Sequence, residues 1–167
     1  MTAPLIVTAL LGVADFAWVD GLRRAHFPPG RNQVPAHITL FRHLPPSVLP
    51  ELKGRLKRLA AGSSPPTRIV GVLNLGNGVA FHIESQRLME MRDDLAEAFT
   101  GLLIPQDQAR PRLHITIQNK ASPTEARALH QAMGVQFMGK RLAIDGLAVW
   151  HYRGGPWELA VKAMFRG

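Results

Sequence analysis

The stretches His37-Ile38-Thr39-Leu40 and His114-Ile115-Thr116-Ile117 are two copies of one four-residue pattern, placed 77 positions apart. Residues on both sides of the pattern match at the same offset: Pro46 with Pro123, Leu52 with Leu129, and Leu56 with Met133. Self-similarity at a fixed offset indicates an internal repeat. We therefore predict two related halves, each holding one copy of the pattern.

Each copy shows the alternation of a half-buried β-strand, in which successive side chains point to opposite faces. The aliphatic residues anchor the strand in the core, and the His and Thr of each copy share the other face. Continued along the strands, this alternation adds Phe41 to the face of the first motif, and Gln118 and Lys120 to that of the second. Such a polar face must meet water, a ligand or a partner.

Two histidines brought to one phosphate from opposite sides would form an acid–base pair. Imidazole titrates near neutral pH, so one ring can take a proton from the attacking oxygen while the other protonates the leaving oxygen. The hydroxyls of Thr39 and Thr116 are short donors that suit the non-bridging phosphate oxygens. One His-x-Thr is weak evidence, but two copies on repeated strands predict catalytic roles for His37 and His114.

The spacing of apolar and turn residues predicts a mixed chain of helices and strands. Strands are expected over 4–11, 36–42, 68–75, 79–84, 113–118, 141–150 and 157–165, and helices over 14–26, 47–60, 86–100 and from Ser122 to about Gly134. Glycine-rich turns at 76–78 and 154–156 predict hairpins, and loops are expected over 28–33 and 102–111. The expected architecture is two lobes packed about a pseudo-twofold axis.

The length of 167 residues fits one domain with a sizeable core. No linker or low-complexity tract divides the chain. We therefore expect a single bilobal domain over 1–167, with repeat halves at about 4–76 and 78–165.

The charge of the chain favours an anionic ligand such as RNA. The chain has 20 basic and 12 acidic residues, a net charge of +8, and 15 of the basic residues are Arg. Guanidinium groups can bind phosphates through two parallel hydrogen bonds. Arg31, Arg42, Arg110 and Arg112 flank the two motifs and are candidates for binding phosphate. The alternative is a soluble surface that is basic but binds no specific ligand.

Several classes of protein and site are disfavoured. The absence of Cys excludes disulfides and thiol nucleophiles. No apolar run is long enough to span a membrane, and no basic segment precedes the apolar start, so we expect a cytoplasmic protein. The seven His residues include no His-x-His or His-Glu-x-x-His spacing, so neither a metal site nor a cofactor is predicted.

The two motifs, with the order of strands and helices around them, resemble the two-histidine (2H) phosphoesterase superfamily, which includes 2′-5′ RNA ligases and RNA 2′,3′-cyclic phosphodiesterases. The resemblance covers nearly the whole chain. It implies a bilobal α+β fold in which each lobe holds an antiparallel sheet with one motif. It also implies that His37 donates a proton and that His114 accepts one.

The resemblance further implies a metal-independent phosphodiesterase that opens 2′,3′-cyclic phosphates to 2′-phosphates, with reversible 2′-5′ RNA ligation as an additional activity. The expected partners are RNA ends or small cyclic nucleotides, and the expected state is a monomer. Two alternatives stay open. One is an enzyme for another cyclic phosphate, such as one derived from ADP-ribose, and the other is a non-catalytic RNA-binding module on the same fold.

Overall fold

A computed structural model of the protein describes residues 3–28 and 34–166, and two four-stranded antiparallel sheets form its centre. The first sheet has the order β2-β1-β7-β8, with bounds Ile38–Leu44, Leu5–Leu11, Ile144–His151 and Glu158–Met164. The second has the order β5-β4-β3-β6, with bounds His114–Gln118, Val79–Glu84, Thr67–Asn74 and Arg141–Leu142. The predicted α+β fold is confirmed, and each sheet takes strands from both halves of the chain.

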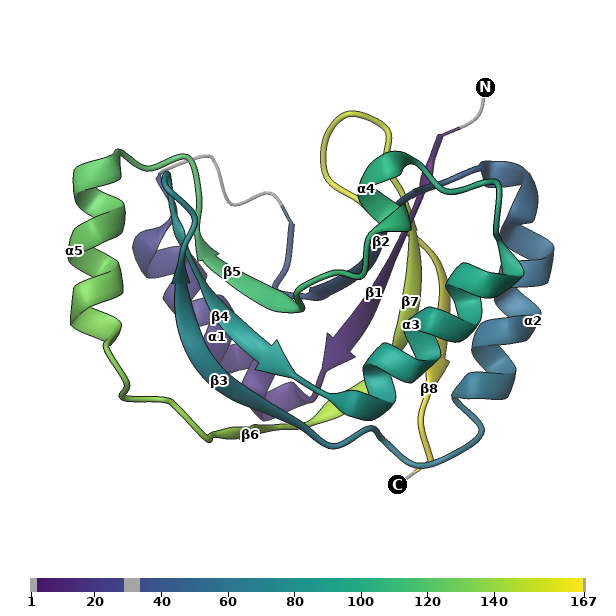
Figure 1. Ribbon diagram of the computed structural model, residues 1–167, viewed down its shortest axis with the longest axis horizontal. Coiled ribbons are helices and arrows are strands. Elements are labelled where there is room, and N and C mark those ends of the chain that lie inside the picture. The colour runs from purple at the N-terminus through teal and green to yellow at the C-terminus, as the bar shows by residue number, and fades with distance from the viewer. Residues whose placement is uncertain (1–2, 29–33, 167) are drawn as a thin grey trace.

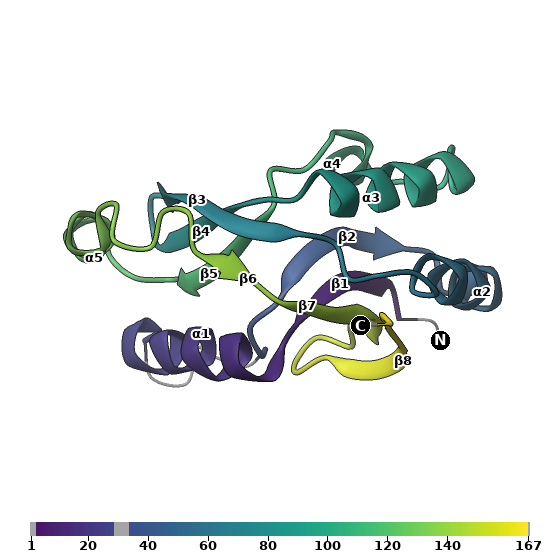
Figure 2. The same ribbon diagram turned by 90° about the horizontal axis from the view of Figure 1, so that it is seen from below.

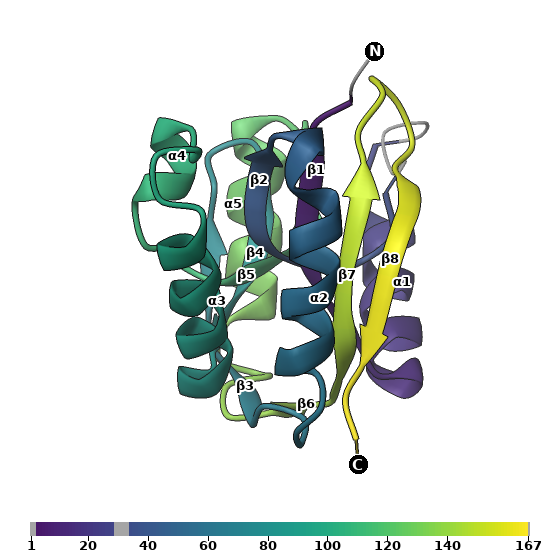
Figure 3. The same ribbon diagram turned by 90° about the vertical axis from the view of Figure 1, so that its right-hand side faces the viewer.

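Helices flank the sheets on several sides. They are α1 (Val13–His26), α2 (Leu49–Leu59), α3 (Gln86–Ala98), the short α4 (Pro105–Gln108) and α5 (Pro123–Met133), with a 3-10 turn at Pro46–Val48 before α2. The helices α5 and α2 lie at the two ends of the molecule (Figure 1). Seen from below, α1 lies on one side of the strands, and α3 and α4 lie on the other (Figure 2). Figure 3, a view from the α2 end, shows α3 beside the β2 edge of the first sheet.

Local sequence signals explain where the helices begin and which face they bury. In α5 the hydroxyl of Ser122 accepts a hydrogen bond from the backbone of Glu125, whose carboxylate accepts one from the backbone of Ser122. This reciprocal capping box satisfies amide groups that the first helical turn leaves free. In α2 the apolar face places Leu52 and Leu56 in the core.

The predicted strand over 141–150 is in fact two strands in different sheets. Between them, the amide of Ala143 donates to the Asp15 carboxylate at 2.7 Å, and its carbonyl accepts from Gly12 at 2.8 Å. These bonds tie the connection to the start of α1, so β6 pairs with β3 while β7 pairs with β1. A continuous apolar pattern could not reveal this change of sheet, because the composition of the segment does not change there.

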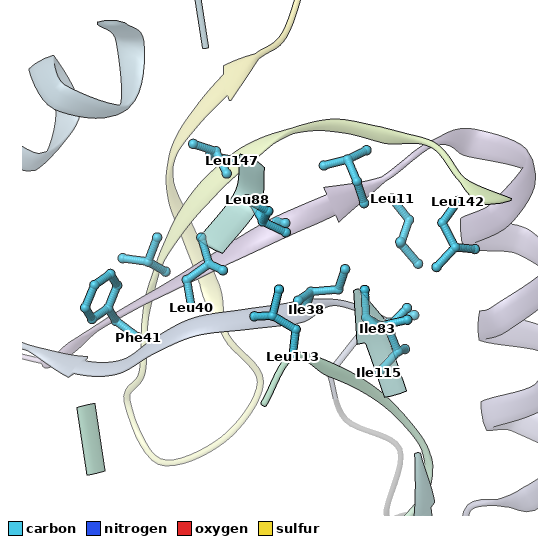
Figure 4. Close-up of a cluster of buried hydrophobic side chains, with 14 of the residues drawn as sticks. Leu11, Ile38, Leu40, Phe41, Ile83, Leu88, Leu113, Ile115, Leu142 and Leu147 are labelled. Atoms are coloured by element: carbon cyan, nitrogen blue, oxygen red, sulfur yellow. The ribbon is translucent and has the colours of Figure 1, made fainter. Parts of the chain in front are cut away.

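Buried apolar side chains from both sheets form one cluster. Figure 4 shows Ile38, Leu40 and Phe41 of β2 in it, together with Ile115 of β5 and Leu88 of α3. The core therefore runs beneath both motif strands and fixes them relative to each other. Within the described ranges, no helix is long and apolar enough to cross a membrane.

Candidate active site

The two motif strands lie at the facing edges of the two sheets. The strand β2 is the edge of the first sheet, β5 is the edge of the second, and the two strands contact each other. In Figure 1 they begin near the middle of the molecule and run away from it in opposite directions. Both motifs sit at these starting points, so the structure brings them to one seam between the sheets.

Both imidazoles are held in the same way. Nδ1 of His37 lies 2.7 Å from the carbonyl oxygen of Pro35, and Nδ1 of His114 lies 2.8 Å from that of Arg112. A carbonyl oxygen only accepts, so Nδ1 is the donor in each ring, and the lone pair of the neutral ring is on Nε2. Neither Nε2 atom has a hydrogen-bond partner in the part of the chain that the structure describes. Each is therefore free to exchange a proton with a ligand.

The two threonines stand beside the histidines on partly exposed positions. In the register of the sheets, Thr39 pairs with Thr8, and Thr116 pairs with Ala80. Among the described residues, neither the Thr39 nor the Thr116 hydroxyl makes a hydrogen bond. Both hydroxyls are available to donate to oxygens of a bound phosphate.

An irregularity in β2 changes the predicted alternation directly after Thr39. One step along β1, from Thr8 to Val7, corresponds to two steps along β2, from Thr39 to Phe41. The extra residue is a β-bulge, and it turns Phe41 to the face of the buried Val7. Phe41 is fully buried in the core, so it does not continue the face of His37 as the alternation predicted (Figure 4).

The strand β5 has the same irregularity at the equivalent place. One step from Ala80 to Val79 in β4 corresponds to two steps from Thr116 to Gln118. Gln118 therefore shares the face of the buried Val79 and is only 5% exposed. The prediction that Gln118 lies on the substrate face is therefore wrong. Lys120 lies beyond the end of β5, exposed and with a φ of 58°, so it does not extend that face either.

The candidate arginines lie in different surroundings. Arg42 is exposed next to the first motif, and its charge acts on His37. Arg112 is exposed, and its carbonyl fixes the ring of His114. Arg110 is exposed and paired with Asp93 at 2.8 Å. Arg31 lies outside the described residues.

Two buried arginines, which the sequence did not predict, connect the two sides of the seam between the sheets. Arg23 of α1 donates to the carbonyl of Thr116 at 2.5 Å and to that of Val34 at 2.6 Å. Arg92 of α3 donates to the carbonyls of Leu40, at 3.1 Å, and Asp107. Arg23 thus connects β5 to the segment before the first motif. Arg92 connects β2 to the segment before the second motif. Hydrogen bonds from a charged donor to buried carbonyls are among the stronger ones.

The predicted loop over 102–111 contains the short helix α4, which places a buried carboxylate under the first motif strand. Asp107 is 3% exposed and accepts hydrogen bonds from the backbone amides of Arg42, at 2.9 Å, and His43, at 3.0 Å. Its charge also faces Arg92. This carboxylate fixes the part of β2 that follows the motif.

The hairpin between β7 and β8 supplies an aromatic wall. The ring of Trp157 lies against His37, with 4.6 Å between the ring centroids. Trp150 lies 6.1 Å from Trp157 and donates to the hydroxyl of Thr8 at 2.9 Å. The ring of Trp157 therefore shields one side of His37 from water. Among the residues that the structure describes, no group of three or more His, Cys, Asp or Glu is placed to hold a metal ion.

Most of the chain matches one family of known proteins. Residues 12–156 match the family model of the 2′-5′ RNA ligase superfamily. The chain belongs to the 2′-5′ RNA ligase superfamily. Both motifs fall within the matched residues, which confirms the resemblance seen in the sequence. Membership in this superfamily supports an RNA ligase-like or phosphoesterase activity.

Solved structures share the fold of this superfamily member. TT0787 of Thermus thermophilus is 19% identical with a TM-score of 0.69, over 100% of this chain and 99% of that chain. E. coli LigT complexed with 3′-AMP is 16% identical with a TM-score of 0.63, over 100% of both chains. E. coli LigT complexed with NADP+ is 15% identical with a TM-score of 0.64, over 99% of both. At these identities the likeness shows the fold alone. No curated protein matches the chain.

The surroundings of His37 suppress its charged form. Burial lowers the pKa of His37 to about 4, although its hydrogen bond to Pro35 acts in the opposite direction. The positive charges of Arg23, His114 and Arg42 lower this pKa further. Without a ligand, His37 is therefore neutral at pH 7.

This low pKa predicts that stability falls in mild acid. The pKa of His37 is about 4 when folded and about 6.5 when unfolded, so the unfolded state binds more protons between these values. The free energy of unfolding should therefore fall as the pH falls through this window, by up to about 3 kcal/mol for this group. Urea unfolding of the wild type and of His37→Gln across this range measures the difference.

The exposed His43 offers a matched control for this prediction. His43→Gln should keep the pH dependence of the wild type, whereas His37→Gln should flatten it. Equal slopes for the wild type and His37→Gln would contradict the lowered pKa of His37.

Proposed function

We propose that this protein opens 2′,3′-cyclic phosphates on RNA ends or nucleotides to give 2′-phosphates, and that an RNA 5′ hydroxyl attacking in place of water forms a 2′-5′ linkage reversibly. The observation that supports this most is the pair of imidazoles, each with Nδ1 bound to a carbonyl and Nε2 free, on facing edge strands. Membership in the 2′-5′ RNA ligase superfamily agrees with this class of chemistry.

In the proposed reaction, water attacks phosphorus and gives its proton to Nε2 of His114. The bond between phosphorus and the ribose 3′ oxygen breaks, and His37 protonates that oxygen, so the phosphate stays on the 2′ oxygen. The hydroxyls of Thr39 and Thr116 donate to the non-bridging oxygens, where negative charge increases. Each histidine ends in the protonation state in which the other began, and proton exchange with solvent restores both.

His37 must gain a proton before it can act as the acid. The anionic phosphate of the substrate favours the charged imidazole, which opposes the effect of burial on the pKa of His37. Substrate binding should therefore be coupled to proton uptake. If His37 is the acid, kcat/KM should fall as the pH rises above the pKa of about 4 that His37 has in the free protein. If His37 were the base, kcat/KM would not change with His37 titration above this pH.

Turnover of a panel of cyclic phosphates, with EDTA present, tests the proposed function. We expect 2′,3′-cyclic CMP to give cytidine 2′-phosphate, which phosphorus NMR distinguishes from the 3′ isomer. Loss of activity with EDTA would overturn metal independence. Turnover of only an ADP-ribose-derived cyclic phosphate would overturn the proposed substrate. Binding of RNA ends without turnover of any of these compounds would instead indicate a binding module.

A further inference from the structure

The face of the second sheet that holds His114 continues into a row of arginines. His82 of β4 pairs directly with His114, so the two imidazoles stand on the same face of neighbouring strands. Two residues further along β4, Glu84 pairs with Arg68 of β3, and Arg68 pairs with Arg141 of β6. Because side chains alternate along a strand, this second row faces the same side as His82 and His114.

The motif strand adds an arginine to the same row. The amide of Ile83 donates to the carbonyl of Leu113 at 2.9 Å, which extends the ladder back to the residue before β5. By alternation, Arg112 then faces the side of His114. This arginine row consists of Arg112, Arg68 and Arg141, with Glu84 of β4 between the first two, and it spans the sheet from β5 to β6, which is three strand spacings or about 14 Å. That length exceeds one nucleotide.

A broad hollow of about 1820 Å³ lies over this row. Its lining includes the start of β3, the end of β4, β6 and the start of α3. These segments come together in the lower middle of Figure 1. His82 and Arg112 are among its lining residues, so the hollow begins directly beside His114. The hollow therefore adjoins the His114 side of the candidate active site, although the four motif side chains are not part of its lining.

The lining of this hollow has more basic than acidic residues. It contains five arginines and two glutamates. Three of these arginines have acidic partners: Arg68 with Glu84, Arg87 with Glu90 and Arg110 with Asp93. Within the described ranges of the chain, Arg112 and Arg141 have none. Both are exposed and can turn their guanidinium groups toward a ligand. Arginine on an open surface suits bidentate contacts with phosphates.

We propose that this arginine row binds the RNA strand that leads to the reacting end, so that the preferred substrate is an oligonucleotide and not a mononucleotide. The inference rests on the proposed function. A 2′,3′-cyclic phosphate occupies the last ribose, so the strand can leave the active site only through the 5′ oxygen of that ribose. On the side of His114, the leaving strand meets Arg112, then Arg68 and Arg141.

Comparing two substrates in arginine variants tests this proposal. The substrates are 2′,3′-cyclic CMP and a pentanucleotide RNA that ends in a 2′,3′-cyclic phosphate. Arg141→Gln, alone and with Arg68→Gln, should raise KM for the pentanucleotide by about three- to tenfold per arginine, and should leave turnover of 2′,3′-cyclic CMP unchanged. The salt dependence of pentanucleotide binding should weaken by about one unit of slope for each lost contact.

Matched variants separate this role from a general effect of charge. Arg58 is exposed on α2 and does not line the hollow, so Arg58→Gln should leave both substrates unaffected. Arg141→Lys should recover most of the affinity, because it keeps the charge. An equal loss for the two substrates, or no loss for the pentanucleotide, would overturn the proposal.

Binding and turnover distinguish this inference from the proposed function. Fluorescence anisotropy with the same pentanucleotide ending in a 2′-phosphate measures binding without chemistry. If binding depends on Arg141 but no cyclic phosphate is turned over, the proposed function fails and the RNA path stands. If cyclic phosphates are turned over but binding does not depend on Arg141 or Arg68, the RNA path fails and the proposed function stands.

Discussion

Replacing either His37 or His114 with alanine is expected to lower turnover of a 2′,3′-cyclic phosphate by about 10²–10⁴-fold, the usual contribution of a general acid or base. Each change removes the Nε2 atom that exchanges a proton with the phosphate. It also removes the hydrogen bond from Nδ1 to a backbone carbonyl. Single-turnover hydrolysis at neutral pH measures the loss without interference from product release.

Three comparisons make this result specific. The double variant should lose less than the product of the single losses, because groups that act as one unit are not additive. Thr39→Ala and Thr116→Ala should lose less than the histidine variants, since each removes one hydroxyl donor. His43→Ala, an exposed change on the same strand, should retain turnover. Full activity with both motif histidines absent would contradict the assignment.

Replacing Asp107 with alanine is expected to cost about 2–4 kcal/mol of unfolding free energy. The change leaves the amides of Arg42 and His43 without their acceptor, and removes the negative charge that faces Arg92. Because these contacts hold the strand that follows the first motif, turnover should fall as well. Urea unfolding at pH 7 measures the loss of stability.

Asp93 is the matched control for Asp107. It also pairs with an arginine, Arg110, but its side chain is 45% exposed. Exposed ion pairs contribute little, so Asp93→Ala should change the unfolding free energy by less than about 1 kcal/mol. Equal effects of the two substitutions would contradict the structural role assigned to the buried carboxylate.

The sequence is most informative where local patterns and the repeat agree. Two copies of His-x-Thr with aliphatic neighbours predicted two strands, and the structure places both at the seam between the sheets. The glycine-rich turn before Val79 predicted the hairpin, in which the amide of Leu75 donates to the carbonyl of Gly78 at 2.8 Å. Alternation and turn composition predict these features, because both depend only on residues that are close in sequence.

The features that the sequence did not predict depend on contacts between distant segments. Regular alternation assigned Phe41 and Gln118 to the substrate face, but a bulge after each motif threonine turns both toward the core. The pairing of strands decides the position of a bulge, and no single strand reveals it. Trp157 reaches His37 only because a hairpin of the first sheet folds over the motif.

A signal for the buried arginines was present in the helices. Arg23 follows Val19 by one helical turn, and Arg92 follows Leu88 in the same way, so both fall on apolar faces. A charged residue on the buried stripe of a helix needs partners inside the protein. The sequence could have identified such residues, but their acceptors lie on other elements and only the fold shows them.

A crystal structure of the protein with uridine vanadate, which mimics the five-coordinate phosphorus of the transition state, would show whether both motif histidines act on one phosphate. We expect Nε2 of His37 and Nε2 of His114 each to lie within about 3 Å of an oxygen of the same vanadate, on opposite sides of it, with the hydroxyls of Thr39 and Thr116 on the remaining oxygens. A vanadate that contacts only one of the two histidines, or neither, would rule out the proposed acid–base pair.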